Sequence, residues 1–509
     1  MTSIEKQKIF SPETAEAWLN AERKDQKLVL CHGVFDLIHP GHIRHLKAAR
    51  ELGDILLVSI TPDRFVNKGP GRPAFTESLR AEVIAALSFV SGVVINDSPT
   101  SVELIKRLKP DIYAKGGDYA NPTNDRTGMI LEEEAAVRSA GGRIQFTEDI
   151  TFSSSELINR HVPLFSPETE KWLSDFRSRH NASEIIHHLE SISDCKVLII
   201  GEAIIDEYVF CNGLGKAAKD PILSFLYNSE QAFIGGSLAI ANHLGGFCNQ
   251  VSLLAMLGDS MRKEEFIRAS LLPNISPHFI TNPQSPTLHK RRFVDCHTSN
   301  KMFELYFMDD TPPSGRIENE LIEQAEALAR QHDIVIVSDY GHGMMTPKLI
   351  ERLAQCAPFL VVNTQANSGN RGFNTISKWP RADYVCLAGH EAELEARQRH
   401  LSRTELMQVI VDAIDCKKFT VTFGKEGTCH WDKDLGETQV PSFAVKVVDR
   451  VGAGDAVLAI TAPLVAKGVN WEIVGFVANL VGAEMVGVLG NSMRLNARVI
   501  AKHIEALLK

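Results

Sequence analysis

The sequence predicts an α/β protein with two domains, each built around a mainly parallel sheet flanked by helices. Three observations lead to this expectation. Short apolar runs alternate with segments of helical periodicity along both halves of the chain. The two halves carry different motifs, which argues against a duplication. The length of 509 residues also exceeds what one ordinary hydrophobic core accommodates.

The first half reads as a doubly wound parallel sheet, Rossmann-like, that ends near residue 160. Buried strands are expected at residues 27–36 (KLVLCHGVFD), 54–60 (DILLVSI), 92–96 (GVVIN) and 111–117 (DIYAKGG). Helices are expected between them, at residues 41–53, 77–90 and 100–110. This alternation is typical of parallel sheets. We therefore expect a first domain over residues 1–162.

A connector separates the two halves. Residues 163–190 contain Pro and Ser breaks within helical patterns, so they are expected to form a helical linker. A second α/β domain over residues 191–509 then opens with a strand at residues 196–210. Further buried strands are expected at residues 333–340, 359–363, 383–389 and 418–424, and the chain is helix-rich from residue 452.

Composition excludes several classes of function. A net charge of −9 argues against a general nucleic-acid binder, which would present a basic surface. No run of about 18 apolar residues predicts a membrane span, and the first ten residues lack the apolar core of a signal peptide. Nine scattered cysteines without paired spacing suggest reduced thiols and a cytoplasmic location.

The stretch GVFDLIHPGHIRHL, residues 33–46, places two histidines around a glycine where a strand gives way to a helix. Backbone N–H groups and the helix dipole at such a turn favour an anion. Gly41 allows close approach, and His39 and His42 can donate to phosphate oxygens that gain charge during transfer. The turn is therefore a candidate phosphate-handling site.

These residues resemble the nucleotidyltransferase superfamily with the HxGH signature. The segments KGPGRPAFTESLRAEVIAAL, AKGGDY and FSSSELINR extend the resemblance over most of residues 25–162. It implies in-line attack of a sugar phosphate on the α-phosphorus of a nucleoside triphosphate, with release of pyrophosphate and with Mg²⁺ on the triphosphate. It implies catalytic roles for His39, His42 and Lys68, a cationic phosphate contact for Arg72, and nucleotide contacts for Gly33, Phe35, Gly41, Arg80, Lys115, Gly117, Asp118, Ser154 and Ser155.

A second candidate site is DRVGAGDAVLAI, residues 449–460. Gly452 and Gly454 precede an apolar helix, and successive N–H groups at such a turn form an anion hole. Asp455 at the helix start can take a proton from a sugar hydroxyl as a general base. The alternative is a glycine-rich turn in which Asp455 only caps the helix.

From about residue 195 onward the chain resembles the ribokinase-like (PfkB) sugar kinases, through the motifs IDEYVF, IGGS, LGD, SDYGHG and VTFGKEG. This resemblance implies that Asp455 is the catalytic base and that Gly452, Ala453 and Gly454 form the anion hole. It implies ATP contacts for Thr422, Gly424 and Gly427, sugar contacts for Asp206, Gly235, Gly236 and Asp339, and a metal contact for Glu393. Residues 207–236 are expected to form a small β lid over the sugar, and the alternative is a surface hairpin.

Three departures from the PfkB pattern stand out. Ala239 stands where family members usually have Asn shortly after the glycine pair, with Asn242 further on. His390 replaces the Asn of the N-x-x-E motif, and VNTQAN replaces the usual Asp-Pro-Lys strand end. These departures leave three alternatives open. The kinase has a different sugar, or its activity is reduced, or the second half is a non-catalytic module for dimerisation or sensing.

Together the two halves resemble the family of bifunctional heptose 7-phosphate kinase / heptose 1-phosphate adenylyltransferases, with the domain order inverted. The resemblance implies phosphorylation of the anomeric hydroxyl of a heptose 7-phosphate and synthesis of ADP-heptose from ATP. It implies small-molecule partners (a sugar phosphate and a nucleoside triphosphate), no nucleic acid, no membrane, and a homodimer. A different sugar or polyol with CTP remains an alternative, and RNA binding, which the HxGH signature also accompanies in aminoacyl-tRNA synthetases, is a third.

Overall fold

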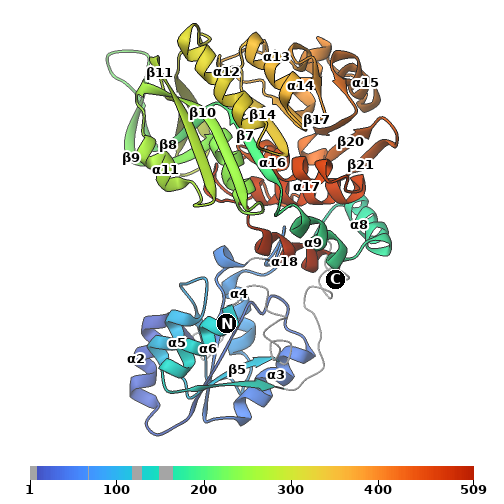
Figure 1. The fold of residues 1–509 in the computed structure, drawn as a ribbon. Helices are drawn as coiled ribbons and strands as arrows, with labels where there is room; N and C mark the ends of the chain where they lie inside the picture. The colour runs from blue at the N-terminus through green and yellow to red at the C-terminus, as the bar shows by residue number, and fades with distance from the viewer. Residues whose placement is uncertain (1–7, 67, 117–128, 148–163) are drawn as a thin grey trace. The chain divides into compact units, whose positions relative to one another are not determined.

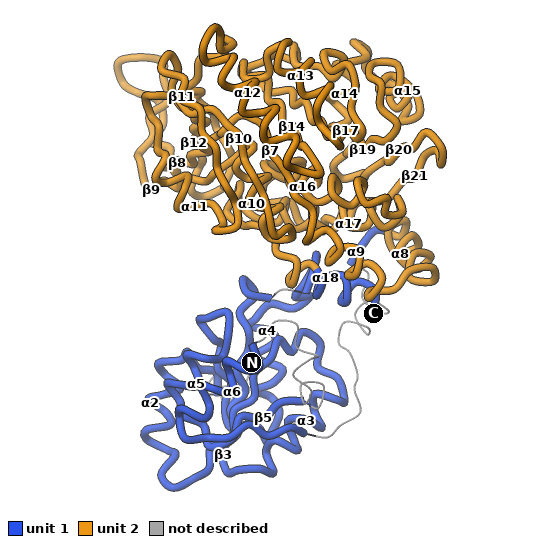
Figure 2. Tube along the Cα trace, in the orientation of Figure 1, with its two compact units in different colours: residues 1–166, 501–509 blue, residues 167–500 orange. Residues whose placement is uncertain are grey.

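The computed structural model describes residues 8–66, 68–116, 129–147 and 164–509. Within them the chain divides into two compact units, residues 1–166 with 501–509 and residues 167–500 (Figure 2). None of the helices in the described ranges has the length and apolar content that a bilayer crossing requires.

The first unit contains a six-stranded sheet in the order β1-β4-β3-β2-β5-β6, with every neighbouring pair parallel. Its strands are β1 (Ile9–Phe10), β2 (Leu28–Gly33), β3 (Ile55–Ile60), β4 (Gly92–Ile95), β5 (Ile112–Gly116) and β6 (Arg143–Thr147). Its helices are α2 (Pro12–Glu22), α3 (Pro40–Glu51), α4 (Glu77–Ala85), α5 (Val102–Leu108) and α6 (Met129–Ser139).

Helices cover both faces of this sheet, because its strands are apolar on both sides. Leu46 of α3 and Ile84 of α4 pack on one face. Leu19 of α2, Ile105 of α5 and Val137 of α6 pack on the other. The expected doubly wound parallel sheet is confirmed.

The second unit is built on a nine-stranded sheet in the order β11-β10-β7-β14-β15-β17-β19-β20-β21. Its strands are β7 (Lys196–Gly201), β10 (Gln250–Ser260), β11 (Ile275–Pro286), β14 (Ile334–Asp339), β15 (Leu360–Thr364), β17 (Tyr384–Ala388), β19 (Lys418–Thr422), β20 (Thr428–Asp432) and β21 (Gly436–Val440). Pairing is parallel from β11 to β19 and antiparallel for β20 and β21.

Helices flank this sheet as well (Figure 1). The helices α12 (Arg316–Ala329), α13 (Pro347–Cys356), α14 (Gly389–Ala396) and α15 (Arg403–Ala413) share one core with it. The helices α10 (Ser237–Gly245), α16 (Ala453–Ala466) and α17 (Trp471–Val486) pack together on the other face. The remaining elements of this unit are α11 (Glu264–Ser270) and the short pair β16 (Arg381–Ala382) and β18 (Asp415–Cys416). The last helix, α18 (Ala497–Leu508), begins in this unit, and its residues from 501 onward belong to the first unit.

A separate four-stranded sheet in the order β13-β12-β8-β9, called the lid below, contains residues 207–236, for which a small β lid is predicted. Its strands are β8 (Ala203–Lys216), β9 (Leu223–Gly236), β12 (Leu288–Asp295) and β13 (Lys301–Phe307). The single strand expected at residues 196–210 is therefore two strands, which belong to different sheets and meet at Glu202.

The region expected to be a linker contains α8 (Pro167–Arg179) and α9 (Ala182–Ser191). Both helices fall within the second unit. The ring of Phe176 stacks on that of Phe476 at 4.8 Å, and Arg179 forms an ion pair with Glu472 at 3.1 Å. The two helices are therefore part of the second unit's packing and not a free connector.

Candidate active sites

The HxGH turn lies between β2 and α3. His39 is the N-cap residue of α3, and Gly41 is buried in the first helical turn. The rings of His39 and His42 stack with their centroids 3.9 Å apart, and Phe35 packs edge-on against His42 at 5.2 Å. The structure thus brings together three of the predicted residues at the start of a helix, where the dipole favours an anion.

Burial sets the protonation of this site. It lowers the pKa of His42 to about 3, with further lowering by His39 and Lys68. It also lowers the pKa of His39. Both imidazoles are therefore neutral near pH 7, so each can offer one N–H to a phosphate oxygen. Lys68 supplies positive charge, although burial lowers its pKa to about 8.

Asp36, which the motif carries next to Phe35, holds the following loop in place. Its carboxylate accepts hydrogen bonds from the backbone N–H groups of Ala74 at 3.0 Å and Phe75 at 3.1 Å. It also forms an ion pair with Arg72 at 3.5 Å. This acidic side chain therefore fixes the loop that carries the candidate cations beside the turn.

Arg80 and Lys115, both predicted as nucleotide contacts, bond to groups of the protein. Arg80 is only 1% exposed and donates to the carbonyls of Val34, Thr61 and Phe75 and to Asp63. Lys115, at the end of β5, forms a buried ion pair with Glu133 at 2.8 Å. Both side chains stabilise the framework, because their charges are directed to protein groups. Of the other predicted contacts, Gly33 ends β2, whereas Gly117, Asp118, Ser154 and Ser155 lie outside the described residues.

The second site forms at the start of α16. Gly452 is the N-cap residue with φ +84°, a conformation that favours glycine, and a β-carbon there would collide with Asn491. Ala453 and Gly454 open the helix, and Asp455 is buried in its first turn. The predicted anion hole and base therefore share one helix N-terminus.

Two neutral donors hold the Asp455 carboxylate. The Tyr340 hydroxyl donates to Oδ1 at 2.9 Å, and the Gln365 side-chain amide donates to the same oxygen at 2.8 Å. Burial raises the pKa of Asp455 to about 6, while the bond from Tyr340 lowers it. The carboxylate is thus ionised near neutral pH and oriented, as a general base must be.

This arrangement predicts the pH dependence of phosphoryl transfer. The rate should fall as the pH drops through about 6, because protonated Asp455 cannot accept the hydroxyl proton. In Tyr340→Phe the lost hydrogen bond should raise the pKa of Asp455, so the acid limb of the kcat profile should move to higher pH. A pH–rate profile of both proteins measures this, and an unmoved limb would show that Asp455 does not control it.

The glycine pair meets Asp206 at the junction of the lid and α10. Asp206 of β8 is buried and forms an ion pair with Arg292 of β12 at 2.5 Å. A β-carbon on Gly235 would collide with the Asp206 carboxylate, and one on Gly236, which has φ +58°, would meet the Glu202 carbonyl oxygen at 2.7 Å. Gly235 is therefore required by its close packing on Asp206, and Gly236 by its positive φ and its close packing on the Glu202 carbonyl.

Asp449 precedes the glycine turn and bonds both to that turn and to the lid. Its carboxylate accepts hydrogen bonds from Tyr208 of β8 and from the N–H groups of Val451 and Gly490. It also pairs with Lys301 of β13 at 2.5 Å. The lid and the candidate anion hole thus share one buried carboxylate.

Asp339, predicted as a sugar contact, lies at the end of β14 and bonds to protein groups there. It is fully buried, pairs with Lys378 at 2.5 Å and accepts a hydrogen bond from Trp379. Tyr340, one residue later, is the side chain that reaches Asp455. Asp339 therefore anchors the end of β14, and its neighbour contacts the candidate base.

The predicted nucleotide contacts lie at the end of β19. Thr422 ends that strand, and Gly424 and Gly427, with φ +59° and +90°, bracket a short turn. A β-carbon on Gly427 would collide with the Val440 carbonyl oxygen. The positive φ angles at Gly424 and Gly427 explain why the motif VTFGKEG has glycine at both positions.

The altered N-x-x-E segment begins α14. Both carboxylate oxygens of Glu391 accept backbone N–H groups, from Ala366 at 3.0 Å and Ala388 at 2.7 Å, and burial raises its pKa to about 7. His390 is largely exposed, and Glu393, the predicted metal contact, is partly exposed. Across the described ranges, no group of three or more His, Cys, Asp or Glu side chains is arranged to hold a metal ion.

The departure at Ala239 is not compensated by Asn242. Ala239 is buried within α10. The Asn242 side chain donates to the Ser270 carbonyl at 2.8 Å and accepts from the Leu272 N–H at 3.0 Å. Its amide is thus committed to a neighbouring loop.

Sequence reasoning missed Gln365, Lys290 and Arg292. Lys290 and Arg292 alternate on β12, so strand periodicity could have placed both on one face. Their partner strand β8 lies more than 80 residues earlier, with Lys290 opposite Asp206. The sequence gives no signal for that pairing.

Two family models match the chain. The cytidylyltransferase-like family covers residues 30–160, and the pfkB family of carbohydrate kinases covers residues 196–496. Among curated proteins, the bifunctional protein HldE of Koribacter versatilis is 43% identical over 141 residues, which are 27% of this chain and 28% of that protein. HldE of Bradyrhizobium diazoefficiens is 27% identical over 327 residues, 62% of this chain and 64% of that protein. The matches thus span less than two-thirds of the length of these relatives.

Solved structures also align with the chain. Ribokinase from Arabidopsis thaliana complexed with ribose and ATP is 16% identical, with a TM-score of 0.48, and the alignment covers 62% of this chain and 99% of the ribokinase. The tetrameric inhibited form of phosphofructokinase-2 from Escherichia coli is 15% identical, with a TM-score of 0.48 and the same coverage.

Proposed function

Because the chain belongs to the pfkB family of carbohydrate kinases and carries a cytidylyltransferase-like domain before it, we propose that it is a bifunctional enzyme of sugar-nucleotide synthesis. In the second unit, a sugar hydroxyl gives its proton to Asp455 and attacks the γ-phosphorus of ATP, whose bond to the bridging oxygen breaks so that ADP leaves. The N–H groups of the turn at Gly452, Ala453 and Gly454 hold the transferred phosphoryl group. One observation carries this proposal: Asp455 lies at the N-terminus of α16, and hydrogen bonds from Tyr340 and Gln365 orient its carboxylate.

The first unit would join the sugar 1-phosphate to a nucleoside triphosphate. The phosphate oxygen attacks the α-phosphorus in line and pyrophosphate leaves, without a covalent enzyme intermediate. His39 and His42 donate to oxygens that gain charge, and Lys68 and Arg72 neutralise the triphosphate. The similarity to HldE supports heptose 7-phosphate as the kinase substrate and ADP-heptose as the product. The alternative product is a CDP-linked sugar or polyol made with CTP.

The residues of the second site suit Mg²⁺ held chiefly by the nucleotide. Mg²⁺ usually takes one or two carboxylates and completes its shell with phosphate oxygens and water. Both oxygens of Glu391 are occupied by backbone N–H groups. Glu393, two residues later on α14, is the carboxylate we propose for the metal. The ion would neutralise charge on the triphosphate.

A product screen tests the proposed function. The purified protein is incubated with ATP or CTP and with phosphorylated heptoses, other sugar phosphates and polyol phosphates, and the products are identified by mass. The proposal expects a bisphosphate from heptose 7-phosphate and a nucleotide sugar from heptose 1-phosphate. Products only from another sugar or only with CTP would replace the heptose or ATP assignment.

A non-catalytic kinase-like module is the second candidate. It is favoured by the commitment of Asn242 to a loop and by the exposed His390 at the motif position of Asn. This candidate predicts nucleotidyl transfer without any phosphorylated sugar from the second unit. The same screen separates it from an active kinase.

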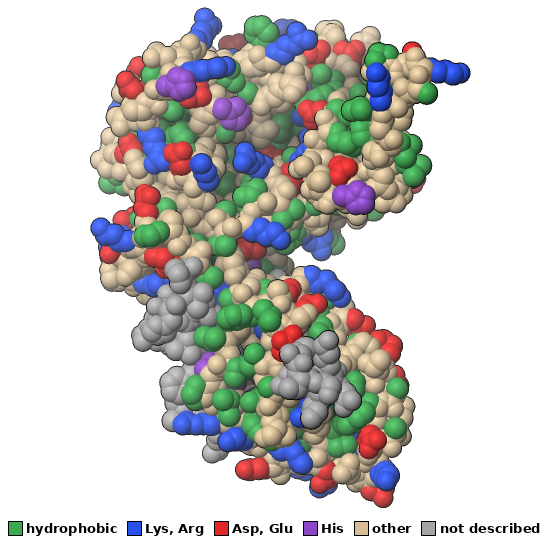
Figure 3. Space-filling view, turned by 180° about the vertical axis from the view of Figure 1, so that it is seen from behind, with side chains coloured by type: hydrophobic (Ala, Val, Ile, Leu, Met, Phe, Trp, Pro, Cys, Tyr) green, Lys and Arg blue, Asp and Glu red, His purple; other side chains and the backbone are tan. Residues whose placement is uncertain are grey.

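We also propose a homodimer formed through the lid. The strand β9 is at the edge of the four-stranded sheet and exposes Leu223, Leu226 and Tyr227 by 69%, 54% and 58%. An edge strand that exposes three large apolar side chains calls for a covering partner, and a second copy offers a matching one. On the face shown in Figure 3, Lys and Arg side chains are interspersed with Asp and Glu side chains, which does not suggest a nucleic-acid partner.

The dimer predicts a simple change of mass. Leu226→Asp should convert a dimer into a monomer, because it buries a charge in the apolar contact. Leu435→Asp, at a position 76% exposed in the turn between β20 and β21, is the matched control and should stay dimeric. Light scattering after size-exclusion chromatography measures both, and an unchanged mass for Leu226→Asp would refute the lid interface.

A further inference from the structure

Asn491 carries a buried side-chain amide beside the glycine turn of the second unit. The residue lies between α17 and α18 and is partly exposed, but its amide nitrogen and its amide oxygen are both buried. Among the described residues, neither atom has a hydrogen-bond partner. Leaving a buried polar group without a partner costs stability, so this amide points to a ligand as its partner.

The amide lies between the two glycine motifs of the candidate site. Its nitrogen is 3.7 Å from the place that a β-carbon on Gly452 would take, and 3.5 Å from the corresponding place on Gly235. Gly452 begins the candidate anion hole, and Gly235 packs on the carboxylate of Asp206, the predicted sugar contact. The NH₂ group of Asn491 is therefore located between the predicted phosphate side and the predicted sugar side of the site.

The backbone next to Asn491 is held by the carboxylate that also holds the glycine turn. The N–H group of Gly490 donates to Asp449 at 3.0 Å, and that of Val451 donates to the other oxygen of the same carboxylate at 3.1 Å. Asp449 is itself buried. The amide and the turn are therefore fixed relative to each other before any ligand binds, as a preorganised donor must be.

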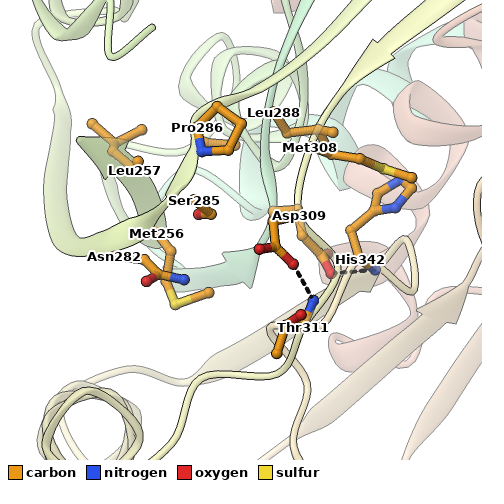
Figure 4. Close-up of a pocket in the computed structure, with 13 residues that line it drawn as sticks. Met256, Leu257, Asn282, Ser285, Pro286, Leu288, Met308, Asp309, Thr311 and His342 are labelled. Carbon is orange, nitrogen blue, oxygen red and sulfur yellow. Dashed lines mark hydrogen bonds between the residues drawn. The ribbon is translucent and has the colours of Figure 1, made fainter. Parts of the chain in front are cut away.

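The turn has room for a ligand beside this amide. A β-carbon on Gly452 would collide with the Asn491 amide oxygen, whereas one on Gly454 would meet no described atom within 4 Å beyond its chain neighbours and its own helix backbone. The small cavity in Figure 4 is a different space, because neither Asn491 nor the glycine turn lines it. The turn therefore combines an open space at Gly454 with a buried donor at Gly452.

We propose that Asn491 is a catalytic residue of the kinase reaction, whose amide N–H groups bind the transferred phosphoryl group. The inference rests on the proposed kinase function and adds a side-chain donor to the backbone N–H groups of the turn. The sugar oxygen bonds to the γ-phosphorus, the bond to the bridging oxygen of ADP breaks, and the hydroxyl proton passes to Asp455. During this step charge is spread over the non-bridging oxygens. A fixed amide stabilises that charge most in the transition state, so it raises kcat.

Steady-state kinetics of two variants test this role. Asn491→Ala removes the amide, and Asn491→Asp keeps its shape but replaces the donor by an oxygen. With heptose 7-phosphate and ATP, kcat of both should fall by about 10²- to 10³-fold, while both KM values change less than about threefold. Asn249→Ala, an exposed change in the same unit, is the matched control and should keep the wild-type kcat.

Three kinetic results would overturn the proposal. An unchanged kcat in Asn491→Ala would show that the amide does not contribute. A full rate in Asn491→Asp would show that the shape of the side chain matters and its N–H groups do not. A loss confined to KM would assign Asn491 to binding of the ground state.

Thermal unfolding separates a phosphoryl contact from a packing role. Without ligands, Asn491→Ala should unfold within about 2 °C of the wild type, because its amide forms no hydrogen bond within the described part of the chain. With Mg²⁺ and ADP, aluminium fluoride stands in for the transferred phosphoryl group and should raise the Tm of the wild type and of Asn249→Ala further. Asn491→Ala should lose this further rise. A clearly lower Tm without ligands, or an undiminished further rise, would contradict the contact.

The two measurements separate this inference from the kinase proposal. If no sugar is phosphorylated but aluminium fluoride still protects the wild type and not Asn491→Ala, the kinase function fails and the phosphoryl contact stands. If the kinase is active and both Asn491 variants keep its rate, the contact fails and the kinase function stands.

Discussion

Asp455→Asn is expected to lower kcat of the phosphoryl transfer by about 10²- to 10⁴-fold, the range typical for loss of a general base. Asparagine has nearly the same shape and keeps an oxygen that can accept the hydrogen bonds from Tyr340 and Gln365. The structure around α16 should therefore persist. Only the ability to take the hydroxyl proton is lost.

Asp220→Asn, an exposed change in the same unit, is the matched control and should leave the rate unchanged. Nucleotidyl transfer from a sugar 1-phosphate should also continue in Asp455→Asn, since the two reactions use different turns. A kinase rate that survives the change would show that Asp455 is only a helix-start residue. It would favour a different base or a non-catalytic module.

His42→Asn is expected to lower kcat of the nucleotidyl transfer by about 10²- to 10³-fold, as for the loss of one preorganised donor to a developing charge. His42 lies partly buried in the first turn of α3, stacked on His39 and packed against Phe35. Asparagine is too short to reproduce both contacts. Rates of pyrophosphate release with a sugar 1-phosphate measure the effect.

His187→Asn, at an exposed position of α9, is the control for this variant and should retain full activity. Sugar phosphorylation by His42→Asn should match that of the wild type. Loss of both activities together would point to misfolding, which thermal unfolding detects. Unchanged pyrophosphate release would remove His42 from the site.

Much of the fold was predictable because buried parallel strands leave a clear pattern. Runs such as KVLIIG and DIVIVSD are apolar on both faces, and their strands β7 and β14 are fully enclosed by helices except at the exposed first residue of β7. The break between β7 and β8 could not be predicted, because apolar residues continue across it. There Gly201 packs closely against Ser338, and Glu202 accepts the N–H groups of Tyr340 and His342.

The candidate sites divide in the same way. The turn from Gly452 to Asp455 at the start of α16 was predictable, because all of its residues are consecutive in the sequence. Tyr340 illustrates the limit, since its hydrogen bond to Asp455 joins residues 115 positions apart and leaves no local pattern in the sequence. Gln365 and Lys290 depend on contacts between distant strands, which a single sequence does not encode in any local pattern.

Label transfer from ATP tests most directly the claim that each unit carries out its own reaction on a triphosphate. The protein is incubated with heptose 7-phosphate and heptose 1-phosphate, in parallel with ATP labelled at the γ- or at the α-phosphorus. We expect the γ label in a phosphorylated heptose and the α label in a nucleotide sugar, with the first lost in Asp455→Asn and the second in His42→Asn. Absence of either label from its product in the wild-type protein, or loss of the wrong label in a variant, would contradict the account for that unit.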